Sequence, residues 1–158
     1  MALLRPLRSS DAPQLVAVYR DAVLSQTQDL YTPEQIRAWA KHAAEDPGFH
    51  ASVARGRGLV SLTSDAPERI AAFALRDPSD RLALLYCRGS ASRQGRGQAL
   101  VRAIEAQARA EGIRRLRTEA SQLSRPLLER LDWRVEAEEE VQFAGVLFRR
   151  WRMIRDLE

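Results

Sequence analysis

A short glycine-containing segment at residues 94–99 precedes a long run of helical periodicity, and its residue types suit the binding of an anion. The first turn of a helix carries backbone N–H groups without helical acceptors and the positive end of the helix dipole. Gly95 and Gly97 allow the backbone to close around an oxygen-rich group, and Arg93 and Arg96 add positive charge. The segment therefore predicts a binding site for a phosphate or a pyrophosphate.

Three known kinds of phosphate-binding loop can be compared with this segment. A Walker loop requires Lys and then Ser or Thr after its last glycine, whereas Gly97 is followed by Gln98 and Ala99. A dinucleotide-binding GxGxxG loop requires a third glycine where this chain has Leu100. The pattern Gln/Arg-x-x-Gly-x-Gly/Ala fits at Gln94, Gly97 and Ala99, and this is the form that the segment favours.

The elements around the loop are predicted from apolar spacing and turn residues, and they describe an α+β chain with one mixed sheet. Their order is β-α-α-β-β-β-α-β-α-β-β. Strands are expected at residues 2–8, 58–65, 69–76, 81–88, 113–121, 133–143 and 146–154, and helices at residues 12–26, 33–46, 97–111 and 124–131. The strand–helix–strand succession around the loop predicts that its two strands are parallel neighbours.

Local signals mark several boundaries of these elements. Thr32 and Gln35 are spaced as a capping box at the start of the second helix. The pair Pro47-Gly48 is expected to end that helix. Residues 65–68 and 77–80 are turn-forming, and they predict an antiparallel meander of the three middle strands.

Length and composition bound the class of protein. The 158 residues, of which 45% are hydrophobic, predict one globular domain over residues 1–158. No apolar run has the roughly 18 residues of a membrane span, and the N-terminus does not resemble a secretory signal, so a cytoplasmic location is expected. A single cysteine, Cys87, excludes an internal disulfide, and two histidines, His42 and His50, do not predict a metal site. The net charge of +4 comes from arginines spread along the chain, so nucleic acid is not the expected partner.

The loop and its placement between a strand and a helix, with segments 118–121 (TEAS) and 124–133 (SRPLLERLDW) downstream, resemble the GNAT family of N-acetyltransferases. The resemblance covers essentially the whole chain, and residues 31–39 and 145–153 are similar to a subgroup of small bacterial acetyltransferases. It implies the acyl-CoA N-acyltransferase fold and acetyl-CoA as cosubstrate, without a metal. In this family a bulge parts the strand before the loop from its parallel neighbour, and pantetheine lies in the V-shaped gap.

The resemblance also implies which residues contact the cosubstrate. Tyr86 and Cys87, near the end of the strand before the loop, would offer backbone groups to pantetheine and to the acetyl carbonyl. Ser121 stands where many family members have an asparagine that contacts pantetheine. Arg130 would reach the nucleotide phosphates, and its alternative is a solvated helix face. The pyrophosphate would be held at Arg93, Gln94, Gly95, Arg96, Gly97, Gln98 and Ala99.

Three departures from the family pattern bear on the site. The connection from the preceding strand to the loop is longer than usual, so either the connection bulges or the bulge lies nearer Gly89 than Cys87. The tyrosine that protonates the departing thiolate in many family members is replaced by Leu128. No general base is obvious. Glu119 is the leading candidate, and its alternative is a structural carboxylate that caps the next helix or pairs with Arg117.

The acceptor side of the site is expected where the first two helices meet. Tyr31 and Gln35, at the start of the second helix, are candidates for contact with the substrate, together with Glu119. Tyr86 is a second candidate for acid–base chemistry, with an aromatic core role as its alternative. The expected function is the transfer of an acetyl group from acetyl-CoA to a primary amine by direct attack, with strand amides stabilising the oxyanion.

Two other functions stay open from the sequence. One is a non-catalytic CoA-binding regulatory module, suggested by Leu128 and by the absence of a clear base. The other is an acetyltransferase acting on RNA or aminoacyl-tRNA, suggested by the isoelectric point of about 10.0. The resemblance also leads us to expect a homodimer, paired through the closing hairpin. The acceptor amine is not specified, because acceptor loops vary freely on one scaffold.

Overall fold

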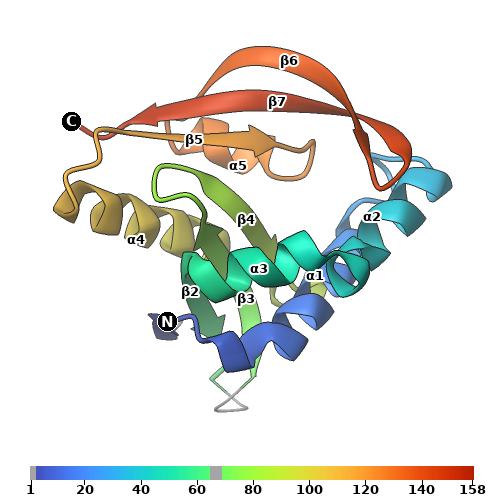
Figure 1. Ribbon diagram of the computed structural model, residues 1–158, viewed down its shortest axis with the longest axis horizontal. Coiled ribbons are helices and arrows are strands. Elements are labelled where there is room, and N and C mark those ends of the chain that lie inside the picture. The colour runs from blue at the N-terminus through green and yellow to red at the C-terminus, as the bar shows by residue number, and fades with distance from the viewer. Residues whose placement is uncertain (1–2, 65–68) are drawn as a thin grey trace.

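The computed structural model describes residues 3–64 and 69–158, which form two neighbouring sheets. The strand orders are β1-β2-β3-β4 and β5-β7-β6. The strands are β1 (Leu3–Pro6), β2 (Arg57–Leu62), β3 (Ile70–Arg76), β4 (Leu82–Cys87), β5 (Arg115–Ala120), β6 (Arg134–Phe143) and β7 (Val146–Asp156), and the α-helices are α1 (Ala12–Gln26), α2 (Pro33–Glu45), α3 (Pro47–Arg55), α4 (Arg96–Ala110) and α5 (Arg125–Arg130). Figure 1 shows the three-stranded sheet across the top, with α4 beneath one end and α2 beneath the other. No helix in the described part of the chain is long and apolar enough to span a bilayer.

The predicted element order is confirmed except in one place. Pro47-Gly48 does not leave a loop after α2 but begins a further helix, α3. The reason is local: Asp46 is the N-cap, its carboxylate accepts a hydrogen bond from the N–H of Phe49 at 3.1 Å, and proline is favoured in a first helical turn. Residue 2 and the predicted turn at residues 65–68 lie outside the described residues.

Two local predictions are confirmed, namely the capping box of α2 and the turn of the closing hairpin. The capping box at the start of α2 is present, because the Gln35 N–H donates to Thr32 Oγ1 at 3.2 Å and the Thr32 N–H donates to Gln35 Oε1 at 3.0 Å. The hairpin between β6 and β7 turns at Ala144 and Gly145, whose φ angles are 52° and 78°. Two consecutive left-handed residues are what a two-residue hairpin turn of the primed type requires.

Strand β3 separates two hydrophobic cores, and all seven of its residues are buried. Phe73 and Leu75 belong to the core beneath α1, α2 and α3, which is rich in aromatic rings. Ala72 and Ala74 belong to the core that joins α4 to β5 and β7. This alternation follows the period of two in a strand, and the first sheet is therefore covered by helices on both faces.

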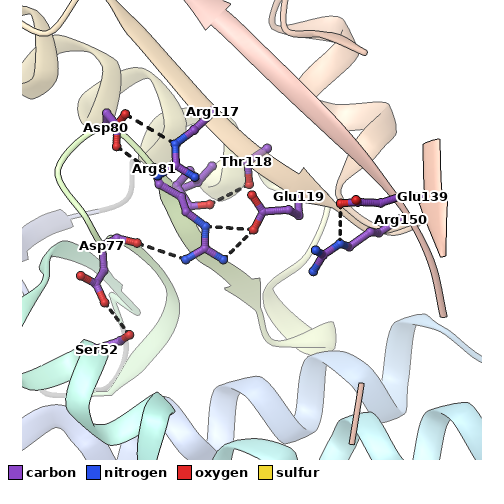
Figure 2. Close-up of polar contacts among 10 residues, drawn as sticks. Ser52, Asp77, Asp80, Arg81, Arg117, Thr118, Glu119, Glu139 and Arg150 are labelled. Carbon is purple, nitrogen blue, oxygen red and sulfur yellow. Dashed lines mark hydrogen bonds and ion pairs between the residues drawn. The ribbon is translucent and has the colours of Figure 1, made fainter. Parts of the chain in front are cut away.

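The two sheets meet where β4 and β5 begin. The parallel pairing that the sequence predicts consists, among the described residues, of a single bridge between Arg81 and Arg117. There the Arg117 N–H donates to the carbonyl of Asp80 at 3.0 Å, and the Thr118 hydroxyl donates to the carbonyl of Leu82 at 2.6 Å. Figure 2 shows this junction, in which β5 is tied to the start of β4 by backbone and side-chain bonds together.

Beyond the junction, β4 leaves β5 because of a bulge. Ala83 is an extra residue on β4, since Leu82 and Leu84 pair with consecutive residues of β3. A bulge bends and twists its strand, so the later part of β4 diverges from β5. The alternative of a bulge residue nearer Gly89 than Cys87 is therefore wrong, and the extra length lies in the connection, which forms a 3₁₀ turn at Gly89–Ala91.

The bond between Thr118 and Leu82 leads to a stability prediction. Replacing Thr118 with Val keeps the shape and the strand preference of the side chain but leaves the buried carbonyl of Leu82 without this donor. We expect the free energy of unfolding, measured by urea titration, to fall by about 1–2 kcal/mol. Thr118→Ser is the control, because it keeps the hydroxyl, and it should recover most of the loss. An unchanged midpoint in Thr118→Val would contradict this description of the junction.

Candidate functional site

A cavity of about 300 Å³, here called the chamber, lies between the diverging sheets and the helices α1, α2 and α3. Its walls include the β4 segment from Arg81 to Tyr86, the end of β5 from Thr118 to Ser121, and the first residues of β7. It is also lined by aromatic side chains from six elements or their ends, namely Tyr19, Tyr31, Trp39, Phe49, Tyr86, Phe143 and Phe148. The chamber has the size of a small-molecule site and combines apolar rings with a few polar groups.

Tyr86 lies at the centre of this aromatic wall. Its hydroxyl accepts a hydrogen bond from Trp39 Nε1 at 3.1 Å, and its ring lies 4.4 Å from that of Tyr19 between centroids. Burial raises the pKa of Tyr86 to about 12, and the hydrogen bond from Trp39 only partly offsets this effect. The phenol is therefore protonated near neutral pH, which makes it a poor proton acceptor.

The two predicted substrate residues on α2 differ in their placement. Tyr31 lines the chamber, and its hydroxyl accepts a hydrogen bond from the N–H of Gln122 at 2.9 Å, which links α2 to the segment after β5. Burial raises the pKa of Tyr31. Gln35 is not among the residues that line the chamber; its side chain completes the capping box and donates to the carbonyl of Leu147 at 3.0 Å. The structure thus brings Tyr31, but not Gln35, to the chamber wall.

Glu119 lines the chamber and forms an ion pair there with Arg81. Arg81 donates to Glu119 Oε1 from Nε at 2.9 Å and from an Nη atom at 2.6 Å (Figure 2). The expected pairing of Glu119 with Arg117 is wrong, because Arg117 pairs with Asp80 at 3.5 Å instead. Glu119 therefore helps to hold β5 against the start of β4, whatever chemical role it has.

The segment after β5 presents small hydroxyls and one apolar side chain to the chamber. The Ser121 hydroxyl accepts hydrogen bonds from the N–H groups of Leu123 and Ser124, both at 3.1 Å, so it organises the start of α5. Leu128, which stands at the position of the familiar tyrosine, is 1% exposed and forms part of the wall. This position therefore supplies an apolar surface and no proton donor.

The backbone of β4 directs polar groups into the space that β5 leaves. In an antiparallel pair of strands, every second residue directs its backbone N–H and C=O to the partner strand. The Arg88 N–H donates to the carbonyl of Ala71, so Tyr86 and Leu84 are the β4 residues whose backbone groups bond to β3. The backbone groups of Leu85 and Cys87 consequently face away from β3, and the Cys87 carbonyl accepts a hydrogen bond from Gln26 Nε2 at 2.5 Å. Of the two residues expected to offer backbone groups, Cys87 has this orientation and Tyr86 does not. Burial also raises the pKa of the Cys87 thiol.

The loop before α4 has the backbone that an anion site requires. Arg93 and Gly95 have φ angles of 59° and 78°, and left-handed residues in such a turn direct successive N–H groups toward one point. Gly95 is the N-cap, and the first helical bond runs from the Ala99 N–H to its carbonyl at 3.0 Å. The amides of Arg96, Gly97 and Gln98 therefore have no helical acceptor, whereas that of Ala99 is used.

The charged side chains near the loop are not all directed to it. Arg96 donates to Ser61 Oγ at 2.8 Å and to the carbonyl of Leu62 at 3.1 Å, so its guanidinium fastens α4 to β2. The expectation that Arg96 adds charge at the anion is not met by this geometry. Arg93 and Arg130 are exposed, and the side chains of Gln94 and Gln98 are exposed as well.

Besides leaving its backbone amide free, Gly97 allows close packing between α4 and α5. A Cβ atom at this position would lie 2.9 Å from Leu127 Cδ2, so the glycine lets α5 approach the first turn of α4 closely. Gly95, by contrast, has no atom within 4 Å of such a Cβ and needs glycine only for its positive φ. The two glycines of the loop are thus required for different physical reasons.

Two functional candidates were missed by the sequence analysis. His42 and Asp46 both line the chamber, and His42 Nε2 lies 3.1 Å from Asp46 Oδ2. Trp39, which binds Tyr86, is another wall residue. The signal available in the sequence was the spacing of four residues between His42 and Asp46, which places them on one face at the end of a helix.

Comparison with known proteins agrees with this geometry. Residues 27–155 match the family model described as the acetyltransferase (GNAT) domain. Among curated proteins, none matches the chain in sequence.

Solved structures with the same fold include three that cover nearly the whole chain. A GCN5-related N-acetyltransferase from Rhodopseudomonas palustris is 24% identical, with a TM-score of 0.91 over 99% of this chain and 96% of that one. The PaiA N-acetyltransferase from Thermoplasma acidophilum, solved with coenzyme A, is 16% identical, with a TM-score of 0.73 over 99% of each chain. A phosphinothricin acetyltransferase from Sinorhizobium meliloti, solved with acetyl-CoA, is 19% identical, with a TM-score of 0.65 over 99% of this chain and 88% of that one. With the family match over residues 27–155, the strand-to-helix loop and the parting of β4 from β5, the chain belongs to the GNAT family of acetyltransferases.

Proposed function

We propose that the protein transfers an acetyl group from acetyl-CoA to the primary amine of a small molecule bound in the chamber. The observation that carries this proposal is the parting of β4 from β5 after Ala83, which leaves the backbone groups of Leu85 and the N–H of Cys87 facing away from β3, while the Cys87 carbonyl is bonded to Gln26. The chamber is bounded by the same stretch of β4. An acyl group lying along β4 would therefore be within reach of an amine in the chamber.

The cosubstrate would be held by backbone rather than by charged side chains. The pyrophosphate of CoA would accept hydrogen bonds from the free amides of Arg96, Gly97 and Gln98 at the start of α4. Pantetheine would pair with β4 through Leu85 and Cys87, in place of the missing strand. Ser121 would face pantetheine from the other side of the gap, and Arg93 and Arg130 remain candidates for the outer phosphates.

The proposed reaction requires that the two reactants are correctly positioned and that one general base is available. The neutral amine attacks the thioester carbonyl, and a β4 amide donates to the oxygen on which negative charge develops. Bringing both reactants to adjacent positions on β4 supplies much of the rate gain, because it replaces a bimolecular encounter. Because Leu128 cannot donate a proton, the departing thiolate must receive its proton from elsewhere in the chamber.

The chamber walls favour an amine carried on an apolar body. Seven aromatic rings face the space, and the rings of Tyr31, Trp39 and Phe148 contact one another at 5.2–6.1 Å between centroids. Burying apolar ligand surface against such rings contributes about 0.8 kcal/mol for each methylene group. We therefore infer that the acceptor is an arylalkylamine or a branched alkylamine rather than a polyamine.

The two other functions have less support. Several arginines are paired with carboxylates, among them Arg115 and Arg134 with Asp156, and this neutralises part of the positive charge that RNA would require. A non-catalytic CoA-binding module would bind CoA in the same way but would release no thiol with any amine. The homodimer stays a prediction, which light scattering on the purified protein can test.

The acceptor class can be tested with a panel of amines at saturating acetyl-CoA, following release of free thiol. We expect kcat/KM for 2-phenylethylamine and isopentylamine to exceed that for glycinamide and spermidine at least about tenfold, since two buried methylenes already correspond to that ratio. A preference for spermidine would contradict the inferred acceptor class. Thiol release with none of the amines, despite CoA binding, would favour the non-catalytic module.

A matched pair of glycine substitutions tests the cosubstrate loop. Gly95 and Gly112 both have positive φ, 78° and 82°, and neither has an atom within 4 Å of an added Cβ. Gly95→Ala and Gly112→Ala should therefore lower the melting temperature by similar amounts, corresponding to roughly 1–2 kcal/mol. Only Gly95→Ala is expected to weaken CoA binding, by tenfold or more in calorimetric titration. Equal dissociation constants in the two variants would show that CoA does not bind at this loop.

A further inference from the structure

The chamber holds a histidine–carboxylate pair to which the proposed function has so far given no role. His42, on the last turn of α2, lies with Nε2 3.1 Å from Asp46 Oδ2, and both residues line the chamber. Their side chains are 26% and 36% exposed, so the pair is open to a bound molecule while being shielded on its other sides. An imidazole held by a carboxylate is the arrangement of a general base.

Asp46 is fixed in place by the local fold. Its Oδ2 atom accepts the N–H of Phe49 at 3.1 Å as the N-cap of α3, and its own N–H donates to the carbonyl of His42 at 2.9 Å. The ring of His42 also packs against that of Phe143, at 4.3 Å between centroids. The imidazole therefore contacts both the capped carboxylate before α3 and the end of β6.

The contact with Asp46 decides which nitrogen of His42 can take a proton. His42 Nε2 lies 3.1 Å from Asp46 Oδ2, so Nδ1 is the ring nitrogen that remains for a bound amine. The other charged groups on the chamber wall are Arg149, Arg150 and the Arg81–Glu119 pair. Arg149 and Arg150 are paired with Glu138 and Glu139 on β6.

The remaining candidates are less suited to accept a proton. The Oε1 atom of Glu119 accepts two hydrogen bonds from Arg81, which reduces its ability to accept a proton. Burial raises the pKa of Tyr86 to about 12, so its hydroxyl is already protonated. Tyr19 and Tyr31 also line the wall, and burial raises the pKa of each. Among the described residues that line the chamber, His42 is the one imidazole, and its Nε2 lies against the capped carboxylate of Asp46.

We propose that His42, positioned by Asp46, is the general base of the acetyl transfer. Nδ1 takes one proton from the acceptor ammonium, and the freed nitrogen lone pair forms the bond to the acetyl carbon. When the carbon–sulfur bond breaks, the second amine proton passes to the thiolate of CoA, and His42 returns its proton to solvent. The products are the acetamide, CoA thiol and one proton. This inference rests on the proposed function.

The test compares pH profiles of kcat/KM for the wild-type protein and four variants, using the best amine of the panel. His42→Gln should lower kcat/KM about 100-fold or more and remove the acidic limb of the profile. Asp46→Asn keeps the cap of α3 and the imidazole, so kcat should fall less and the acidic limb should remain.

Two further variants serve as controls. His50→Gln, which changes the other histidine, should leave the profile unchanged. The fourth variant, Glu119→Gln, tests the other candidate for the general base. An unchanged dissociation constant for CoA in His42→Gln shows that this variant is folded.

The outcomes separate this inference from the proposed function. A wild-type profile in His42→Gln, with the large loss in Glu119→Gln instead, would overturn the role of His42 and leave the acetyltransferase intact. An absence of thiol release by the wild-type protein with every amine would overturn both. A loss in His42→Gln together with a retained acidic limb would show that His42 acts through packing and would also overturn the proposal.

Discussion

The bonds that join the first residues of β5 to the start of β4 are the constraint on which the site depends. Thr118, Arg117 and Glu119 hold Leu82, Asp80 and Arg81, and directly afterwards the extra residue Ala83 turns β4 away. Because the strands are fixed on one side of this point and released on the other, the gap has a closed end and an open end. A coenzyme that binds along β4, as proposed, would have both an edge to pair with and a closed end that limits its position.

Two different physical means serve the two reactants on either side of that gap. The loop before α4 has left-handed residues and free amides, which suit an anion without a charged side chain whose rotamers must be fixed. The chamber has rings that are held by one another and by the bond between Trp39 and Tyr86. Under the proposed function, binding of the phosphate would be a property of the backbone, whereas selection of the acceptor would be a property of side chains.

The sequence predicted those parts that depend on neighbouring residues. The glycines of residues 94–99, the capping box of α2 and the hairpin turn are set by φ preferences and short-range hydrogen bonds, and the structure has them. The position of the bulge at Ala83, the partner of Glu119 and the meeting of His42 with the chamber depend on which distant strands and helices come together. Apolar periodicity carries no information on those contacts. Pro47 follows the end of α2 as predicted, but the cap that Asp46 provides also starts α3 there.

The division of the interior by β3 has a consequence for how this protein can change over generations. The chamber rings belong to the core beneath α1 to α3, while the first turn of α4 is anchored in the core on the opposite face. If the proposed function holds, exchange of one ring for another can alter which amine fits while the loop before α4 stays as it is. Descendants of this chain could then acquire new acceptors by substitutions in one half of the interior.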